Sequence, residues 1–330
     1  MSRRVHRERR GSAFQLLPLL LVLACQAPHD NPLDPANPDY PYARLSGTVR
    51  TASYPHLPIP TAVFEWKPGA DLAHSAADGS FLFDRIMPRS GRLLCTHPDY
   101  FSDSLAITLQ PGKTTDAEFL LNMKPTLDYF RIYSIVLNRY PALRTYQIGV
   151  ACRINDQDAD IDSVWLENSA LALRMPLPYN TSAREYQKTC TPADLHLPSI
   201  QELPGMGFTV KVADRSGRTV TPGQAAVRRI ITDEVTFVEP VNYQAVVAQP
   251  SFTWEKLSPG FDFTYTMEIY TADLLPLKVW EKSGISAETT HLWIDRRLDP
   301  GDYYWVIWCV DAFGNRARSR PASFTVRSTR

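Results

Sequence analysis

The sequence has few of the residue groupings on which most enzymes depend. Beyond residue 25, no two of its histidines stand at helical or strand spacing, which argues against a zinc site. It contains no Gly-x-Ser-x-Gly elbow, no phosphate-binding glycine loop and no dinucleotide fingerprint. An active site would have to be assembled from residues far apart in the chain. The sequence therefore predicts a protein that is not an enzyme.

An excess of one charge is also missing. The 330 residues include 35 basic and 35 acidic side chains. Residues 1–24 hold five of the arginines and one glutamate, so the rest of the chain keeps 30 basic and 34 acidic residues. A mildly acidic chain lacks the basic footprint that nucleic-acid binding needs. We therefore expect no nucleic-acid partner.

Long amphipathic helices are absent after residue 25, and the hydrophobic pattern has a period of two instead. The 27 prolines outnumber the 15 glycines, which suits short strands joined by many turns. The length fits two or three domains of roughly 100 residues. We predict an all-β chain with three tandem immunoglobulin-like β-sandwich domains after a signal peptide (1–24) and a flexible, proline-rich tether (25–43).

The N-terminus combines an arginine-rich stretch with an apolar run, residues 14–24, that ends at Cys25. Val22-Leu23-Ala24-Cys25 resembles the lipobox at which bacterial lipoproteins are cleaved and acylated. The resemblance implies a membrane partner, held through lipid on Cys25. Gln26 follows in place of an inner-membrane retention aspartate, which implies a bacterial cell envelope location at the outer membrane. The alternative is an ordinary secretory signal with an incidental cysteine.

The first predicted domain covers residues 44–123. Extended pieces such as 46–50, 80–83 and 117–121 are separated by turns, and Asp78-Gly79 predicts a hairpin turn because glycine accepts a positive φ. The order of the pieces resembles carboxypeptidase regulatory-like domains, which are seven-stranded sandwiches. That resemblance implies no peptidase activity. It departs at residues 51–57, where a longer segment replaces a short turn.

The second predicted domain covers residues 124–232. Its clearest strand is 146–154, in which alternate residues from Tyr146 to Ile154 share one apolar face. Residues 207–214 form another, ended by a Ser-Gly turn. This pattern is immunoglobulin-like. Thr191 and Pro192 can begin one short helix.

The third predicted domain covers residues 233–330. Alternate residues of 261–269 are apolar, and 300–305 reads Pro-Gly-Asp-Tyr-Tyr-Trp before a strand that is apolar on both faces. This segment resembles a fibronectin type III domain. We expect Trp254 and Trp305 in its core. For Trp280 and Trp293 two alternatives stay open: a place in the core, or an exposed platform on which a sugar could stack.

An acidic run offers a candidate metal site. Counting Asp156 as position one, carboxylates fall at positions 1, 3, 5, 7 and 12, a spacing that suits calcium. The ligands would come from Asp156, Asp158, Asp160 and Asp162. However, position six is Ile161 where an EF-hand needs glycine, and 161–167 also predicts a strand. The alternatives are one structural calcium ion and a plain acidic loop between strands.

Four cysteines remain after Cys25, and only Cys152 and Cys190 share a predicted domain. Export would expose them to an oxidising compartment, which favours a disulfide between them. Cys152 also lies on an apolar strand face, where a buried free thiol is equally ordinary. Cys309, among large apolar residues, is expected in the core.

Three functions fit these features. The first is a non-catalytic, surface-anchored lipoprotein that displays β-sandwich modules for adhesion or for binding a protein or glycan partner. The second is an accessory subunit of an envelope secretion or polymer-uptake complex, which a contiguous apolar patch would favour. The third is a carbohydrate-binding lipoprotein, which a row of exposed aromatic residues on one sheet would favour.

Overall fold

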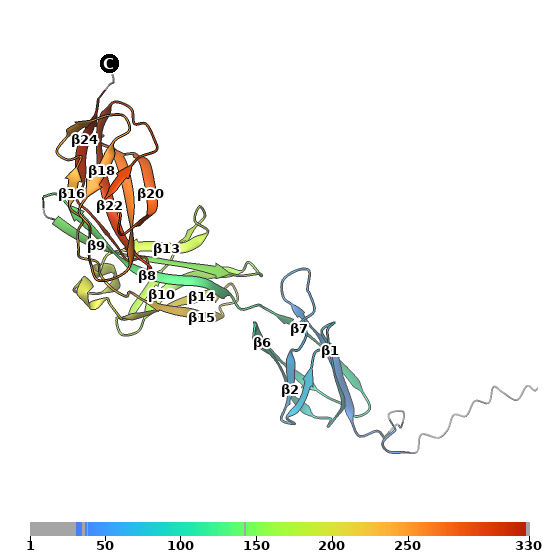
Figure 1. Cartoon of the computed structure of the whole chain (residues 1–330). Helices are drawn as coiled ribbons and strands as arrows, with labels where there is room; N and C mark the ends of the chain where they lie inside the picture. Colours follow the sequence, from blue (N-terminus) through green and yellow to red (C-terminus); the bar gives the residue numbers. More distant parts are fainter. Residues whose placement is uncertain (1–30, 35–36, 38, 142, 328–330) are drawn as a thin grey trace, which may run out of the picture. The chain divides into compact units, whose positions relative to one another are not determined.

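The computed structural model describes residues 31–327, apart from residues 35–36, 38 and 142 (Figure 1). Within those residues the chain forms 24 strands and two short 3-10 helices, which confirms the all-β prediction. None of the helices in this range is long and apolar enough to span a membrane. The predicted signal peptide and Cys25 lie outside the described residues. The chain divides into two compact units, up to Asn122 and from Met123 onward, and each is described by itself.

The end of the predicted tether is folded into turns. The backbone amides of Asp34, Asn37 and Tyr40 each donate to the carbonyl oxygen three residues earlier, at 2.9 to 3.0 Å. The Tyr40 side chain is buried. The segment therefore begins to pack on the first unit before the first strand begins.

The first unit is a sandwich of two sheets. Its strands are β1 (Ala43–Thr51), β2 (Val63–Lys67), β3 (Asp71–His74), β4 (Ser80–Ile86), β5 (Ser90–His97), β6 (Tyr100–Thr108) and β7 (Thr114–Leu121). One sheet has the order β4-β1-β7 and the other β3-β2-β5-β6. Alternate residues of both sheets point inward, as the period of two requires. The core they form includes Leu45, Phe64, Trp66, Phe81, Leu93 and Phe119.

The Asp78-Gly79 turn forms, but it is not a hairpin. Gly79 has φ +79°, and a Cβ there would lie 2.4 Å from the carbonyl oxygen of Val49, so the site needs glycine. Of the flanking strands, β3 pairs with β2 and β4 pairs with β1. The chain therefore crosses from one sheet to the other at this turn.

The second unit begins with a sandwich around its own core. Its elements are β8 (Thr126–Arg139), β9 (Leu143–Asn155), β10 (Ile161–Asn168), β11 (Leu173–Pro176), β12 (Tyr179–Asn180), β13 (Glu185–Cys190), η1 (Ala193–Leu195), η2 (Ile200–Glu202), β14 (Gly207–Asp214) and β15 (Thr219–Ala226). Ile148, Val150 and Cys152 of β9 are buried in this core, with Tyr146 and Ile154 packed against it. The alternation predicted for that strand is confirmed.

A further set of strands encloses another core in the same unit. They are β16 (Phe237–Glu239), β17 (Gln244–Val246), β18 (Ser251–Trp254), β19 (Phe263–Thr271), β20 (Lys278–Ser286), β21 (His291–Trp293), β22 (Gly301–Asp311), β23 (Arg316–Arg318) and β24 (Ala322–Val326). Trp254, Trp305 and Phe324 are at most 1% exposed and lie in this core. One sheet beside this core has the strand order β16-β18-β21. The other is part of a larger sheet and has the order β23-β22-β19-β20.

One sheet runs through both parts of the second unit. β8 pairs in parallel with β23, from Ile135 opposite Arg316 to Leu137 opposite Arg318. This pairing joins strands of the two cores into a ten-stranded sheet. Val136 and Ala317 pack together in a small buried cluster at the same place. The predicted boundary at residues 232 and 233 stays a prediction, because a core lies on each side of it but the sheet is continuous.

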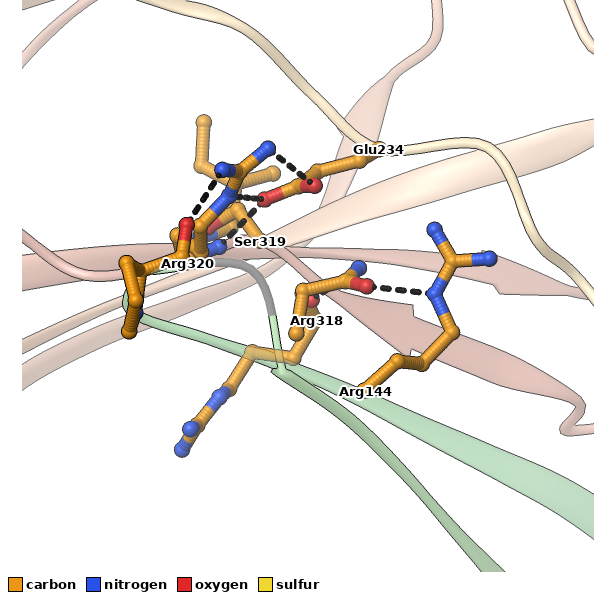
Figure 2. A network of polar contacts seen from close by, with 8 residues as sticks. Arg144, Glu234, Arg318, Ser319 and Arg320 are labelled. Atoms are coloured by element: carbon orange, nitrogen blue, oxygen red, sulfur yellow. Dashed lines mark hydrogen bonds and ion pairs between the residues drawn. The ribbon is translucent and has the colours of Figure 1, made fainter.

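Polar side chains reinforce this junction (Figure 2). Arg320 donates to both carboxylate oxygens of Glu234, at 2.9 and 3.0 Å, and to the carbonyl oxygen of Pro141 at 3.0 Å. Asn138 accepts from Arg144 at 2.7 Å and donates to the carbonyl oxygen of Arg318 at 2.9 Å. Residues separated by about 180 positions in the sequence are thus tied together.

A second polar network at the junction centres on buried side chains. Asn315 Oδ1 accepts from the backbone amide of Ser134 at 2.9 Å, and Asn315 Nδ2 donates to Asp311 Oδ2 at 2.9 Å. Arg229 Nε lies 3.2 Å from the same carboxylate oxygen. Asn315 and Ser134 are both 0% exposed. Because buried polar groups are costly when unpaired, this network fixes how β8 meets the turn before β23.

Candidate binding face

The ten-stranded sheet has one face that does not line the hydrophobic cores. Ile132 and Val150 point into one of those cores, so the alternate residues Arg131, Tyr133 and Arg153 point to the opposite face. The register places Trp308 opposite Arg318 on that same face. Residues from four strands, β9, β8, β23 and β22, therefore meet on a single surface.

Arginines and aromatic rings alternate across this surface. Each guanidinium carbon lies 5.1 to 5.9 Å from the centroid of a neighbouring ring, within the range of a cation–π contact. We call the set the arginine–aromatic row, which runs in the order Arg153, Tyr129, Arg131, Tyr133, Arg316, Trp308, Arg318. The row crosses the junction, because Tyr133 belongs to β8 and Trp308 to β22.

Near each end of the row, a glutamate accepts a hydrogen bond from an aromatic side chain. Glu185 accepts a hydrogen bond from the Tyr129 hydroxyl and lies 3.9 Å from Arg131. Burial, followed by this hydrogen bond, raises the pKa of Tyr129. At the other end, Glu268 accepts from Trp308 Nε1 at 2.8 Å. The hydrogen bonds to these two carboxylates hold the Tyr129 and Trp308 side chains in place.

A close contact beneath the row explains a glycine in the middle of a strand. Tyr133 lies over Gly149 of the neighbouring strand β9, and a Cβ at Gly149 would be 2.2 Å from Cζ of that ring. Glycine inside a strand often marks such a close approach. Ile135, Leu137 and Val306 share this face and are buried. Long arginine stems and flat rings cover apolar surface in this way while their polar ends stay in water.

The two tryptophans that were expected in the core do lie there, and the two for which alternatives stayed open differ from each other. Trp254 and Trp305 are core residues. Trp280 is also buried, at 9% exposed, and its Nε1 donates to Asp295 at 2.8 Å. Trp293 is 64% exposed and borders a pocket of about 280 Å³ that Glu239 also lines.

An exposed apolar turn lies between β19 and β20. Leu274, Leu275 and Leu277 are 98%, 81% and 66% exposed. The turn is closed by a bond from the Thr271 amide to the Leu277 carbonyl oxygen at 3.0 Å. The sequence analysis did not single out this leucine turn, although three leucines within four residues were visible.

The structure does not bring the four predicted calcium ligands, Asp156, Asp158, Asp160 and Asp162, together in one site. Within the described residues, no three His, Cys, Asp or Glu side chains are grouped so that they could hold a metal ion. Asp156 Oδ2 instead accepts from the backbone amides of Asp160 and Ile161, at 2.9 and 3.2 Å. Asp158 Oδ2 accepts from the amide of Met123 at 2.6 Å. Asp162 belongs to β10, so the carboxylates serve a turn and a strand rather than one cage.

The structure also keeps the two cysteines of the predicted disulfide apart. Cys152 and Cys190 are both buried free thiols. In the antiparallel pair of β13 and β9, Cys152 stands opposite Tyr186 and Cys190 opposite Ile148. The two cysteines are therefore four positions out of register, about 13 Å along the strand, whereas a disulfide needs Cα atoms within about 7 Å. Burial raises the pKa of Cys152 to about 12 and that of Cys190 to about 11.

Comparison with known proteins gives similarity of fold only. No protein-family model matches the chain, and no curated protein does. Among solved structures, the FN1-FN3 domains of chicken CNTN1 are 9% identical, with a TM-score of 0.32, over 83% of this chain and 93% of that one. The fibronectin(III)-like modules of Clostridium thermocellum CbhA are 14% identical, with a TM-score of 0.29, over 62% and 93%. A DUF3823 family protein from Bacteroides ovatus is 13% identical, with a TM-score of 0.23, over 56% and 98%.

Proposed function

We propose that this chain is a non-catalytic binding protein of the bacterial envelope, held at the outer membrane by lipid on Cys25. The observation that carries the proposal is the arginine–aromatic row, which gathers side chains from four strands on the face of the sheet away from the cores. A rigid sheet that presents preorganised side chains loses little conformational entropy when a ligand binds. The folded units then serve to display this face.

The binding role is tested with residues 26–330 on a glycan array and in a pull-down from envelope extracts. We expect a ligand whose binding falls in the Arg131→Gln variant, because Arg131 is exposed and belongs to the row. Arg174→Gln is the matched control, since Arg174 stacks on Trp165 at 4.3 Å on another sheet. Binding that both variants lower equally, or no binding partner in either assay, would refute the role of the row.

The anchor is tested separately in the full chain. The Cys25→Ser variant is expected to lose labelling by a palmitate analogue and to leave the membrane fraction. The alternative of an ordinary secretory signal with an incidental cysteine predicts that neither property changes. Partitioning and labelling that survive the substitution would therefore remove the anchor from the proposal.

Trp293 supports a second candidate, a carbohydrate-binding lipoprotein. Its ring is exposed, unlike those of the core tryptophans, and the adjoining pocket is lined by Glu239, Gln244 and Ser251, which can hydrogen-bond sugar hydroxyls. If a glycan binds there, Trp293→Ala abolishes the binding and Arg131→Gln leaves it unchanged. The reverse pattern would assign the glycan to the arginine–aromatic row.

The leucine turn supports the remaining candidate, an accessory subunit of an envelope complex. Exposed apolar side chains gathered in one place commonly mark a contact with another protein. A double variant, Leu274→Ser with Leu275→Ser, is expected to lose a protein captured by the parent chain if this turn is the contact. Unchanged capture would exclude the turn.

A further inference from the structure

The rings of the arginine–aromatic row are already occupied. Tyr133 has the guanidiniums of Arg131 and Arg316 over it, at 5.9 and 5.4 Å from its centroid. Trp308 likewise has those of Arg316 and Arg318, at 5.1 and 5.9 Å. Two guanidiniums over each ring leave little ring surface on which a sugar or a nucleobase could stack. The chemistry that the row still offers is that of the arginines themselves.

Three of the four arginines have no carboxylate partner. Arg131 forms an ion pair with Glu185 at 3.9 Å. Among the residues that the structure describes, Arg153, Arg316 and Arg318 form no ion pair. The Nε–H groups of Arg316 and Arg318 are buried and donate to no protein acceptor. Burial and the neighbouring Arg139 lower the pKa of Arg318, and together they outweigh the raising effect of Tyr304, Tyr270 and Glu268. An arginine stays protonated even so.

The spacing of these charges is regular. Arg316 and Arg318 are two residues apart on β23, about 7 Å along the strand, and point the same way. The planar guanidinium fork matches a carboxylate or sulfate in a two-bond geometry, and stacking on a ring holds that plane fixed. A polymer with an anion on each repeating unit would engage several arginines at once, which multiplies a weak single contact.

We propose, as an extension of the proposed function, that the arginine–aromatic row binds an acidic polysaccharide through its carboxylate or sulfate groups. A chain of nucleotides is disfavoured because its bases find no free ring on which to stack. An acidic peptide that binds by strand addition needs an open sheet edge, whereas β23, which carries Arg316 and Arg318, is paired on both sides, with β8 and with β22. A flat, charged face suits a sugar chain lying across it.

The test measures binding of residues 26–330 to pairs of polymers that differ only in charge. Polygalacturonate is compared with its methyl ester, and dextran sulfate with dextran, by calorimetry at 50 and 500 mM salt. We expect the acidic member of at least one pair to bind at least about tenfold more tightly than its neutral partner, because each charged hydrogen bond lost costs about a factor of ten. High salt should weaken binding because exposed charges are screened.

Variants then assign the binding to the row. Arg131→Gln and Arg153→Gln change exposed residues and are expected to preserve the fold, and together they should weaken binding about tenfold or more. Arg318→Lys keeps the charge but loses the planar fork, so it should also weaken binding. Arg174→Gln should have no effect. Unfolding in urea checks that every variant is folded.

The outcomes separate this inference from the function on which it rests. Equal binding of acidic and neutral chains would overturn the inference while leaving a glycan-binding protein. Preferential binding of oligo(dT) or polyglutamate would overturn the assignment to a polysaccharide. If no acidic chain binds but the row still captures a protein in the pull-down, the inference fails and the proposed function stands. If nothing binds in any assay, both fail.

Discussion

The buried Asn315 offers a quantitative test of how the second unit is held together. Its truncation in Asn315→Ala leaves the buried amide of Ser134 without an acceptor, which costs about 1–3 kcal/mol. It also removes a hydrogen bond to the Asp311 carboxylate, a further contribution of about 1.5–3 kcal/mol. Arg229 remains beside that carboxylate at 3.2 Å, so its charge keeps a partner. We therefore expect a loss of about 3 kcal/mol in the free energy of unfolding.

Urea denaturation of residues 26–330, followed by tryptophan fluorescence, measures this loss. With a slope of about 2–3 kcal/mol per molar for a unit of this size, the midpoint should fall by about 1 M. Asn180→Ala is the control, because Asn180 accepts only from the amides of Ser182 and Ala183 in an exposed turn, at 3.0 and 3.1 Å. A midpoint shift for Asn315→Ala no larger than that of the control would refute the role given to the buried network.

Further predictions concern the row and the thiols. Gly149→Ala should cost about 1–3 kcal/mol in urea, because its Cβ would overlap the Tyr133 ring, whereas Gly207→Ala, with nothing within 4 Å, should be nearly neutral; equal effects would contradict the overlap. Cys152, with its pKa raised to about 12, should resist alkylation at pH 8 in the native protein. In denaturant all four thiols of residues 26–330 should react. If two thiols stay unreactive in denaturant, Cys152 and Cys190 form a disulfide after all. In the unfolded chain the Cys152 thiol ionises near pH 9.0, so its contribution to stability is full below pH 9 and is lost between pH 9 and about 12. Cys152→Ala should therefore show a shallower fall in unfolding free energy over that range, by up to about 1.4 kcal/mol per pH unit, and an unchanged slope would contradict it.

The features that could be predicted from the sequence were those that depend on residues close together in the chain. The strand around residues 146–154 was found because its apolar residues alternate, and β14 (Gly207–Asp214) was found for the same reason. The turn at Asp78-Gly79 was also found. Its role in crossing between sheets was not, because strand partners are chosen by contacts between residues far apart, which no short pattern contains.

The residues of both predicted sites lie apart in the structure for the same reason. The carboxylates from Asp156 to Asp162 had suitable spacing in sequence, but a calcium loop must curl around the ion and β10 is extended instead. Cys152 and Cys190 lie in one core, yet the register of two adjacent strands keeps them apart. Spacing along the chain could not supply either of these three-dimensional facts.

The arginine–aromatic row was missed because its members come from two distant stretches of the chain, 129–153 and 308–318. Tyr129, Arg131 and Tyr133 alternate within one strand, and Arg316 and Arg318 do so in another. Each motif alone is an ordinary half-exposed strand. Only the parallel pairing of β8 with β23 brings the two together, and that pairing joins residues about 180 positions apart.

That pairing also dictates an order of assembly. A ribosome delivers the chain from its N-terminus, so β8 is made long before residues 316–318 exist. Until residues 316–318 emerge, the edge of β8 at residues 135–137 has open amide and carbonyl groups that can recruit the wrong strand. Closing a loop of this length is slow as well as late. Deleting residues 316–330 would remove β23 and β24, and we expect such a chain to aggregate rather than to keep the sandwich of β8 to β15 folded.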